Sequence, residues 1–139
     1  HCEPELADYV AGRDDWDVAT LALSVNMANA DFSTAEFRER VEYFLDTVAG
    51  AHPDKPVVAV TLFPYFADVT ASGDPDRAEA FREALRSSVA ASPHDNLSLV
   101  EGTDLVSAGD LTWDVLHPGD EGMEAIGDGV AAHLETVLD

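Results

Sequence analysis

The stretch "DVATLALSV", Asp17 to Val25, decides the fold of this chain because it is an almost unbroken apolar run. A run of this kind is typical of a strand that is buried on both faces of a parallel sheet. Two later runs have the same character: "PVVAVTLF", Pro56 to Phe63, and "NLSLVEG", Asn96 to Gly102. We therefore expect three strands, and we expect the first to need neighbours at both of its edges, because an exposed apolar edge invites association.

Amphipathic segments alternate with these strands. Ser33 and Glu36 form a capping box that begins a helix ending near Gly50. Asp74 and Pro75 are the residue types preferred at the N-cap and first position of another helix. The other two helices are expected over Glu5–Ala11 and over a closing segment with apolar residues at helical spacing, namely Met123, Ile126, Val130, Leu134 and Val137. The order predicts one α/β domain over residues 1–139, with a parallel sheet and right-handed crossovers.

The composition is strongly acidic, with 28 acidic against 7 basic residues and a formal net charge of −21. This charge argues against nucleic acid and anionic membranes as partners, because both require a basic patch. Lys55 is the only lysine, and this depletion indicates a protein from a salt-accumulating organism, where salt screens the repulsion. No apolar run approaches the roughly 18 residues of a membrane span, and no signal-peptide pattern is visible, so we expect a cytoplasmic protein. The single cysteine, Cys2, excludes an intrachain disulfide and a thiolate metal cluster.

The segment "TWDVLHPGDEG", Thr112 to Gly122, places an aspartate three residues before a histidine. Asp114 could accept a hydrogen bond from one imidazole nitrogen of His117, which would leave the other nitrogen free as a general base. Taken alone, the same spacing also fits an aspartate that caps a turn beside a surface histidine.

Asn26 stands at the end of the first expected strand. Its amide could donate a hydrogen bond to a developing oxyanion, although asparagine also tolerates loop conformations. Asn26, the segment "PYFADVT" from Pro64 to Thr70, and the loop with Asp114 and His117 should all lie beyond the carboxyl ends of the strands. Ligands bind at that edge of open α/β sheets. Within the middle segment, Tyr65 and Phe66 could line a substrate pocket or simply pack at the end of a strand.

Two of these segments together resemble conserved blocks of the SGNH (GDSL-type) hydrolase family: "LSVNM", Leu23 to Met27, and "DVLHPGDEGMEAIG", Asp114 to Gly127. The first block departs from the family pattern, since Ser24 replaces a frequent glycine and Met27 a frequent aspartate. The resemblance implies a flavodoxin-like three-layer α/β/α fold and hydrolysis of a small-molecule ester without a metal or other cofactor. It also implies that His117 is the general base, that Asp114 orients it and that Asn26 is an oxyanion donor.

The serine nucleophile of that family is not found in this chain. No Gly-Asp-Ser triplet and no G-x-S-x-G elbow occurs, and "SGDP" at Ser72 has the wrong order. The resemblance implies that the serine lies upstream, so we expect an N-terminally incomplete domain that lacks the first strands. An N-terminal segment, a partner chain or a second copy would then complete it. A substitute serine is a further possibility, with candidates at Ser24, Ser33, Ser72 and Ser107.

Two other interpretations remain open. The chain could be a non-catalytic, truncated α/β module that binds a small ligand or a partner. It could also bind a hard cation weakly, although no spaced ligand loop is present; the acidic candidates are Asp110, Asp114, Asp120 and Glu121 together with His117. An esterase would lose activity on His117→Ala, and its activity should rise through roughly pH 6 to 7, as expected for a histidine base.

Overall fold

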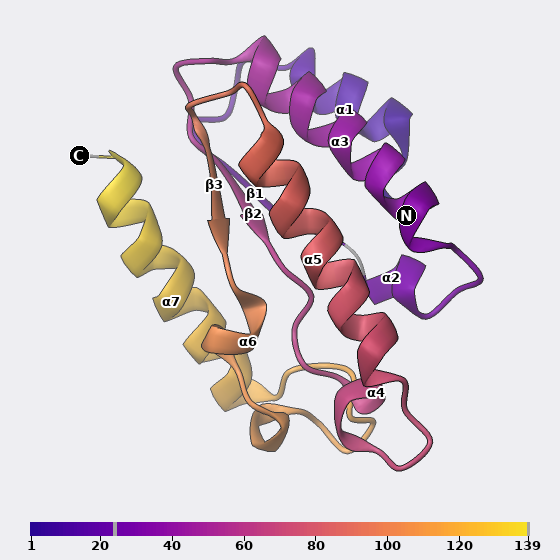
Figure 1. Cartoon of the computed structure of the whole chain (residues 1–139). Helices are drawn as coiled ribbons and strands as arrows, with labels where there is room; N and C mark the ends of the chain where they lie inside the picture. Colours follow the sequence, from indigo (N-terminus) through magenta and orange to yellow (C-terminus); the bar gives the residue numbers. More distant parts are fainter. Residues whose placement is uncertain (24, 139) are drawn as a thin grey trace.

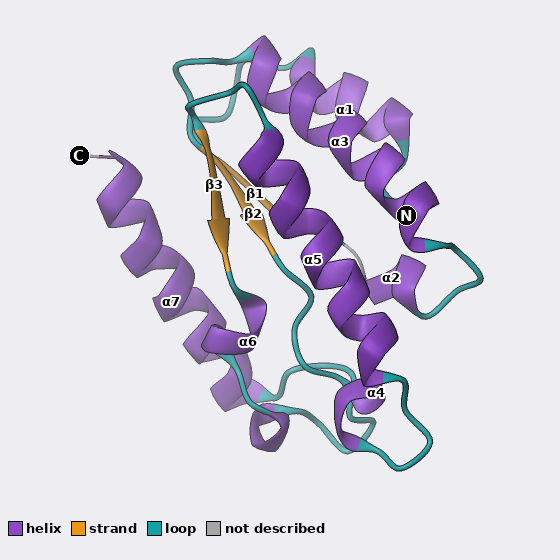
Figure 2. Cartoon of the chain, viewed as in Figure 1, coloured by secondary structure: helices purple, strands orange, loops and turns teal. Residues whose placement is uncertain are grey.

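Three parallel strands form the centre of the molecule, as Figures 1 and 2 show. The computed structural model describes residues 1–23 and 25–138. The strands lie in the order β1-β2-β3 and are shorter than the apolar runs that contain them: β1 is Ala19–Ala22, β2 is Val57–Val60 and β3 is Leu97–Val100. The register pairs Ala19 with Val57 and Val57 with Leu97.

Helices cover both faces of this sheet. On one face α1 (Pro4–Ala11), α3 (Thr34–Ala51) and α5 (Pro75–Ala91) pack side by side, and α7 (Asp120–Leu138) lies on the other (Figure 1). The predicted three-layer α/β/α fold is therefore confirmed. No helix in the described part of the chain is long and apolar enough to cross a bilayer.

The core is divided between these two faces by the central strand. All four residues of β2 are buried, and they alternate between the layers. Val57 and Ala59 belong to the large cluster under α1, α3 and α5. Val58 and Val60 face the opposite side, where Leu134 of α7 packs against them.

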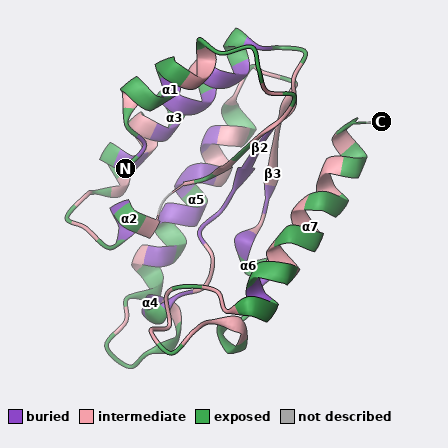
Figure 3. Ribbon diagram, turned by 180° about the vertical axis from the view of Figure 1, so that it is seen from behind, coloured by how far each residue is buried: buried purple, intermediate pink, exposed green. Residues whose placement is uncertain are grey.

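The apolar sequence of β1 predicts burial on both faces, and this prediction is wrong for the described residues. Ala19 and Leu21 pack against the large cluster, whereas Thr20 and Ala22 are exposed. The reason is geometric: among the described residues β1 pairs only with β2, and α7 contacts the β2–β3 side of the sheet. The apolar face of α7 is also incompletely covered, as Figure 3 shows, with Met123 58% and Leu138 59% exposed.

The predicted helix starts are confirmed. The Ser33 hydroxyl accepts the Glu36 N–H and the Glu36 carboxylate accepts the Ser33 N–H, while the Asp74 carboxylate accepts the Arg77 N–H. The closing helix begins at Asp120 and contains all five apolar positions expected for it.

Short helices follow each strand, in segments whose sequence predicts strand ends or loops. They are α2 (Val25–Ala28), α4 (Phe66–Val69), α6 (Gly102–Leu105) and the 3-10 turn η1 (Ala108–Asp110). Asn26 therefore lies in α2, not at the end of a strand. The described register of β1 ends at Ala22, opposite Val60, the last residue of β2, and α2 begins at Val25.

Candidate active site

The structure brings Asp114 and His117 into direct contact on the loop between η1 and α7. His117 Nδ1 lies 2.7 Å from Asp114 Oδ2. Because an ionised carboxylate can only accept, Nδ1 carries the proton, and Nε2 is left as the acceptor of the neutral ring. The His117 side chain is 71% exposed, so Nε2 can reach a group that enters from outside.

The second carboxylate oxygen of Asp114 is held by three further donors. Oδ1 accepts the Thr112 hydroxyl at 2.7 Å, the Leu116 N–H at 2.9 Å and the His117 N–H at 3.0 Å. The bond from the His117 ring, followed by these others, holds the pKa of Asp114 well below its usual range. Asp114 is therefore a fixed negative charge that orients the imidazole. Thr112 was not among the residues singled out from the sequence.

Removing one of these donors should raise the pKa of Asp114. Because its pKa is lowered in the folded chain, the ionised Asp114 contributes its full stabilisation at pH values above about 4, the usual carboxyl pKa. This stabilisation is lost as the pH falls through the lowered pKa. In Thr112→Val we expect the carbon-13 titration midpoint of the Asp114 carboxyl to move up toward the usual value. The same Asp114 midpoint in Thr112→Val as in the unmodified chain would contradict the role of Thr112. A midpoint near the usual carboxyl value in the unmodified chain would contradict the lowered pKa itself.

The loop that carries the pair is closed by its own backbone. The Thr112 N–H donates to the His117 carbonyl at 2.8 Å, and the Val115 N–H donates to the Thr112 carbonyl at 2.9 Å. Val115 has φ 54°, a left-handed conformation that is costly for a β-branched residue, by about 1–3 kcal/mol. The hydrogen bonds around Asp114 keep the chain in this conformation and place His117 beside the carboxylate.

The loop is attached to the start of α7 by a close backbone contact. The Gly119 N–H donates to the Asp110 carbonyl at 2.7 Å, and Leu111 bridges to Pro118. Gly122, in the first turn of the helix, lies against the same carbonyl: a Cβ there would stand 2.7 Å from the Asp110 oxygen. No side chain fits at this position without moving the backbone of the loop.

Gly122→Ala should therefore destabilise the protein, by about 1–3 kcal/mol as for other overpacking substitutions. The matched control is Gly127→Ala in the same helix, where a Cβ would meet nothing within 4 Å. This change should stabilise by about 0.5–1 kcal/mol, because alanine is the better helix former. Urea unfolding in molar salt measures both, and equal effects of the two substitutions would show that the contact at Gly122 is not tight.

Asn26 is an exposed residue of α2, the short helix after β1, and so lies beyond the carboxyl end of that strand. A small cavity of about 80 Å³ lies beside it, lined also by Ala22 and by His1 and Cys2. No hydrogen bond between described residues joins Asn26 to Asp114 or His117. The structure thus places Asn26 on the expected edge without bringing it into contact with the pair.

The serines considered as substitute nucleophiles are not seen at His117. Ser33 and Ser107 cap α3 and η1, and Ser72 lies in an exposed turn. Ser24 lies outside the described residues. Among the described residues, the serine hydroxyl that contacts a histidine ring nitrogen is that of Ser98, 2.8 Å from His133 Nε2, between β3 and α7.

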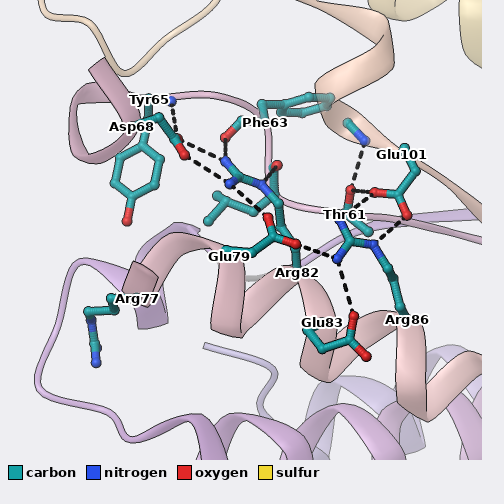
Figure 4. A network of polar contacts seen from close by, with 12 residues as sticks. Thr61, Phe63, Tyr65, Asp68, Arg77, Glu79, Arg82, Glu83, Arg86 and Glu101 are labelled. Atoms are coloured by element: carbon teal, nitrogen blue, oxygen red, sulfur yellow. Dashed lines mark hydrogen bonds and ion pairs between the residues drawn. The ribbon is translucent and has the colours of Figure 1, made fainter. Parts of the chain in front are cut away.

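A buried arginine fixes the loop between β2 and α4, at the carboxyl end of β2 (Figure 4). Arg82 of α5 donates to the Leu62 and Phe63 carbonyls and, through two nitrogens, to both Asp68 oxygens at 2.8 Å. This holds the segment that contains Tyr65. Within the described residues, no three His, Cys, Asp or Glu side chains lie close enough to hold a metal ion.

The sequence model of the GDSL-like lipase/acylhydrolase family matches residues 3–125. No curated protein matches the chain. Among solved structures, the chain is similar to the salicylyl-acyltransferase SsfX3 from a tetracycline biosynthetic pathway, with a TM-score of 0.80 and 15% identity. It is also similar to a protein described as a GDSL-like lipase from Bacteroides ovatus (TM-score 0.79, 20% identity) and to a carbohydrate esterase family 3 protein from Talaromyces cellulolyticus (0.74, 17%).

These structural relatives are longer than the chain. The alignments cover 99%, 99% and 96% of this chain but 42%, 40% and 66% of the three relatives, in the same order. At these identities the likeness establishes the fold alone.

Proposed function

The chain belongs to the GDSL-like lipase/acylhydrolase family, and we propose that it forms the acid–base part of a serine ester hydrolase. In this proposal His117 is the general base, Asp114 orients it, and Asn26 donates a hydrogen bond to the oxyanion. The observation that carries the proposal is the 2.7 Å contact between His117 Nδ1 and Asp114 Oδ2, made by an imidazole whose other side is open.

In this proposal the reaction passes through an acyl-serine. His117 Nε2 takes the proton of a serine hydroxyl as the serine oxygen attacks the ester carbonyl. The carbonyl electron pair moves onto its oxygen, where the Asn26 amide stabilises the charge. Collapse of the tetrahedral intermediate expels the alcohol, which receives the proton from His117. Water then attacks the acyl-serine through the same base, which releases the acid and restores the serine.

The nucleophile in this proposal comes from outside these 139 residues. Two surfaces support this. One is β1, which pairs only with β2 among the described residues and whose second face is exposed at Thr20 and Ala22; the other is the partly uncovered apolar face of α7, at Met123 and Leu138. A segment with a strand paired to β1 and an apolar helix against α7 would bury both surfaces. Its serine would then stand at the carboxyl edge of the sheet.

The substrate class is that of the family, an ester of a small molecule. The relatives include a salicylyl-acyltransferase and a carbohydrate esterase, so acyl groups on alcohol oxygens are the first substrates to try. The test is hydrolysis of p-nitrophenyl acetate in molar salt, first by this chain and then by the chain joined to a serine-bearing strand and helix. Turnover only in the joined form supports the proposal. Its absence in both at every pH would favour the non-catalytic module.

A further inference from the structure

Arg77 binds the backbone of the segment that follows Asn26. Arg77 lies near the start of α5, apart from the carboxylates bound by Arg82 and Arg86 on the same helix (Figure 4). Its Nε donates to the Ala28 carbonyl at 2.9 Å. One terminal nitrogen donates to the Ala30 and Phe32 carbonyls at 2.9 and 2.7 Å.

These contacts supply what α2 lacks by itself. A helix of four residues is too short to be stable alone, and its last carbonyls have no partner within the helix. The Arg77 guanidinium satisfies the carbonyl of Ala28, the last residue of α2, and also binds the Ala30 and Phe32 carbonyls in the segment that follows. A cation at a helix C-terminus is also favoured by the direction of the peptide dipoles. Met27 and Ala28 are buried in the main core cluster and also hold α2 in place.

The guanidinium is itself held in place. Its central carbon lies 4.9 Å from the centroid of the Phe81 ring, which is fully buried. Arg77 makes no ion pair with a carboxylate side chain among the described residues. Its charge is therefore directed at the backbone of residues 28–32, and a planar fork that reaches several carbonyls is a geometry that lysine cannot reproduce.

We infer that Arg77 is a positioning residue of the esterase: it fixes the turn of α2 so that the exposed amide of Asn26 is aimed at the oxyanion. The inference rests on the proposed function, in which Asn26 is the oxyanion donor. Arg77 acts through the main chain that follows Asn26, and it need not touch the substrate.

The first test uses this chain and needs no activity. The Asn29 N–H donates to Val25 O at 3.0 Å and the Ala30 N–H to Met27 O at 3.2 Å, so their hydrogen exchange reports opening of α2. In Arg77→Gln and in Arg77→Lys we expect both amides to exchange at least about 10-fold faster, with core amides of α3 unchanged. The matched control is Arg38→Gln, which removes an exposed ion pair with Glu42. Unchanged exchange of both amides would overturn the inference.

The second test is a kinetic cycle in the enzyme that contains the serine-bearing segment. Asn26→Ala should lower kcat by about 10²–10³-fold, as loss of an oxyanion donor does. Arg77→Gln should lower kcat with little change in KM, and should have almost no further effect in the Asn26→Ala background. If the separate losses of kcat in Arg77→Gln and Asn26→Ala multiply in the double variant, the inference is overturned. Full activity of Asn26→Ala would instead refute the oxyanion role of Asn26 in the proposed function. The hydrogen-exchange result would still show whether Arg77 stabilises α2.

Discussion

Replacing His117 with alanine should reduce ester turnover by about 10³-fold or more, while the fold remains intact. The substitution removes the group that takes the serine proton and returns it to the leaving alcohol. It also leaves the Asp114 carboxylate with its three remaining donors, so the loop should keep its shape. The measurement is kcat/KM for p-nitrophenyl acetate in molar salt, in the enzyme that contains the serine-bearing segment, with circular dichroism to check the fold.

The chain offers a matched control at a second histidine–aspartate pair. His94 Nε2 lies 2.7 Å from Asp46 Oδ1, the same contact distance as in the proposed site, but between α3 and the loop before β3. His94→Ala should leave turnover within about twofold of the original, because His94 lies away from the carboxyl edge of the sheet. Equal losses in the two variants would mean that any histidine substitution disturbs the protein, and undiminished turnover in His117→Ala would exclude His117 as the base.

Replacing Arg82 with methionine should destabilise the protein by about 3–5 kcal/mol, the usual cost of breaking a buried ion pair by removing one partner. The Arg82 side chain is 4% exposed and that of Asp68 19% exposed. Methionine fills much of the space of the arginine stem, so the loss comes from the guanidinium. Without the guanidinium, the largely buried Asp68 carboxylate loses its ion-pair partner, and the Leu62 carbonyl loses the hydrogen bond from Arg82.

Urea unfolding at a fixed salt concentration measures this effect. Arg38→Met is the control, because Arg38 and Glu42 form an exposed pair at 3.9 Å that should contribute less than about 1 kcal/mol. If Arg82→Met cost no more than the control, the network of Figure 4 would not be what fixes the loop between β2 and α4.

Local features of the site were predictable from the sequence. The contact between Asp114 and His117 spans three residues, so a single turn suffices to form it, and the residue types themselves suggest the bond. The capping pairs at Ser33 and Asp74 are equally local and are confirmed. The order of strands and helices followed from the alternation of apolar runs and amphipathic segments, because each run is long enough to show its periodicity.

Features that depend on distant partners were not predictable. Arg77 and Arg82 bind backbone carbonyls 45–49 and 19–20 positions away, respectively, and a carbonyl has no sequence signature. The exposed face of β1 was also missed, since an apolar run indicates burial but does not say which element provides it. Asn26 lies in α2 and not in β1 because the register with β2 ends at Ala22. The apolar run itself does not mark this end point.

Labelling with a fluorophosphonate in molar salt, followed by peptide mapping, tests the central proposal most directly, namely that His117 activates a serine outside these 139 residues. We expect no labelling of the chain alone, and labelling of the added serine when a serine-bearing strand and helix are joined to it. His117→Ala should abolish that labelling. Labelling of a serine within these 139 residues, whether Ser24 or Ser98 beside His133, that depends on His117 would contradict the account. So would an added serine that reacts equally well without His117.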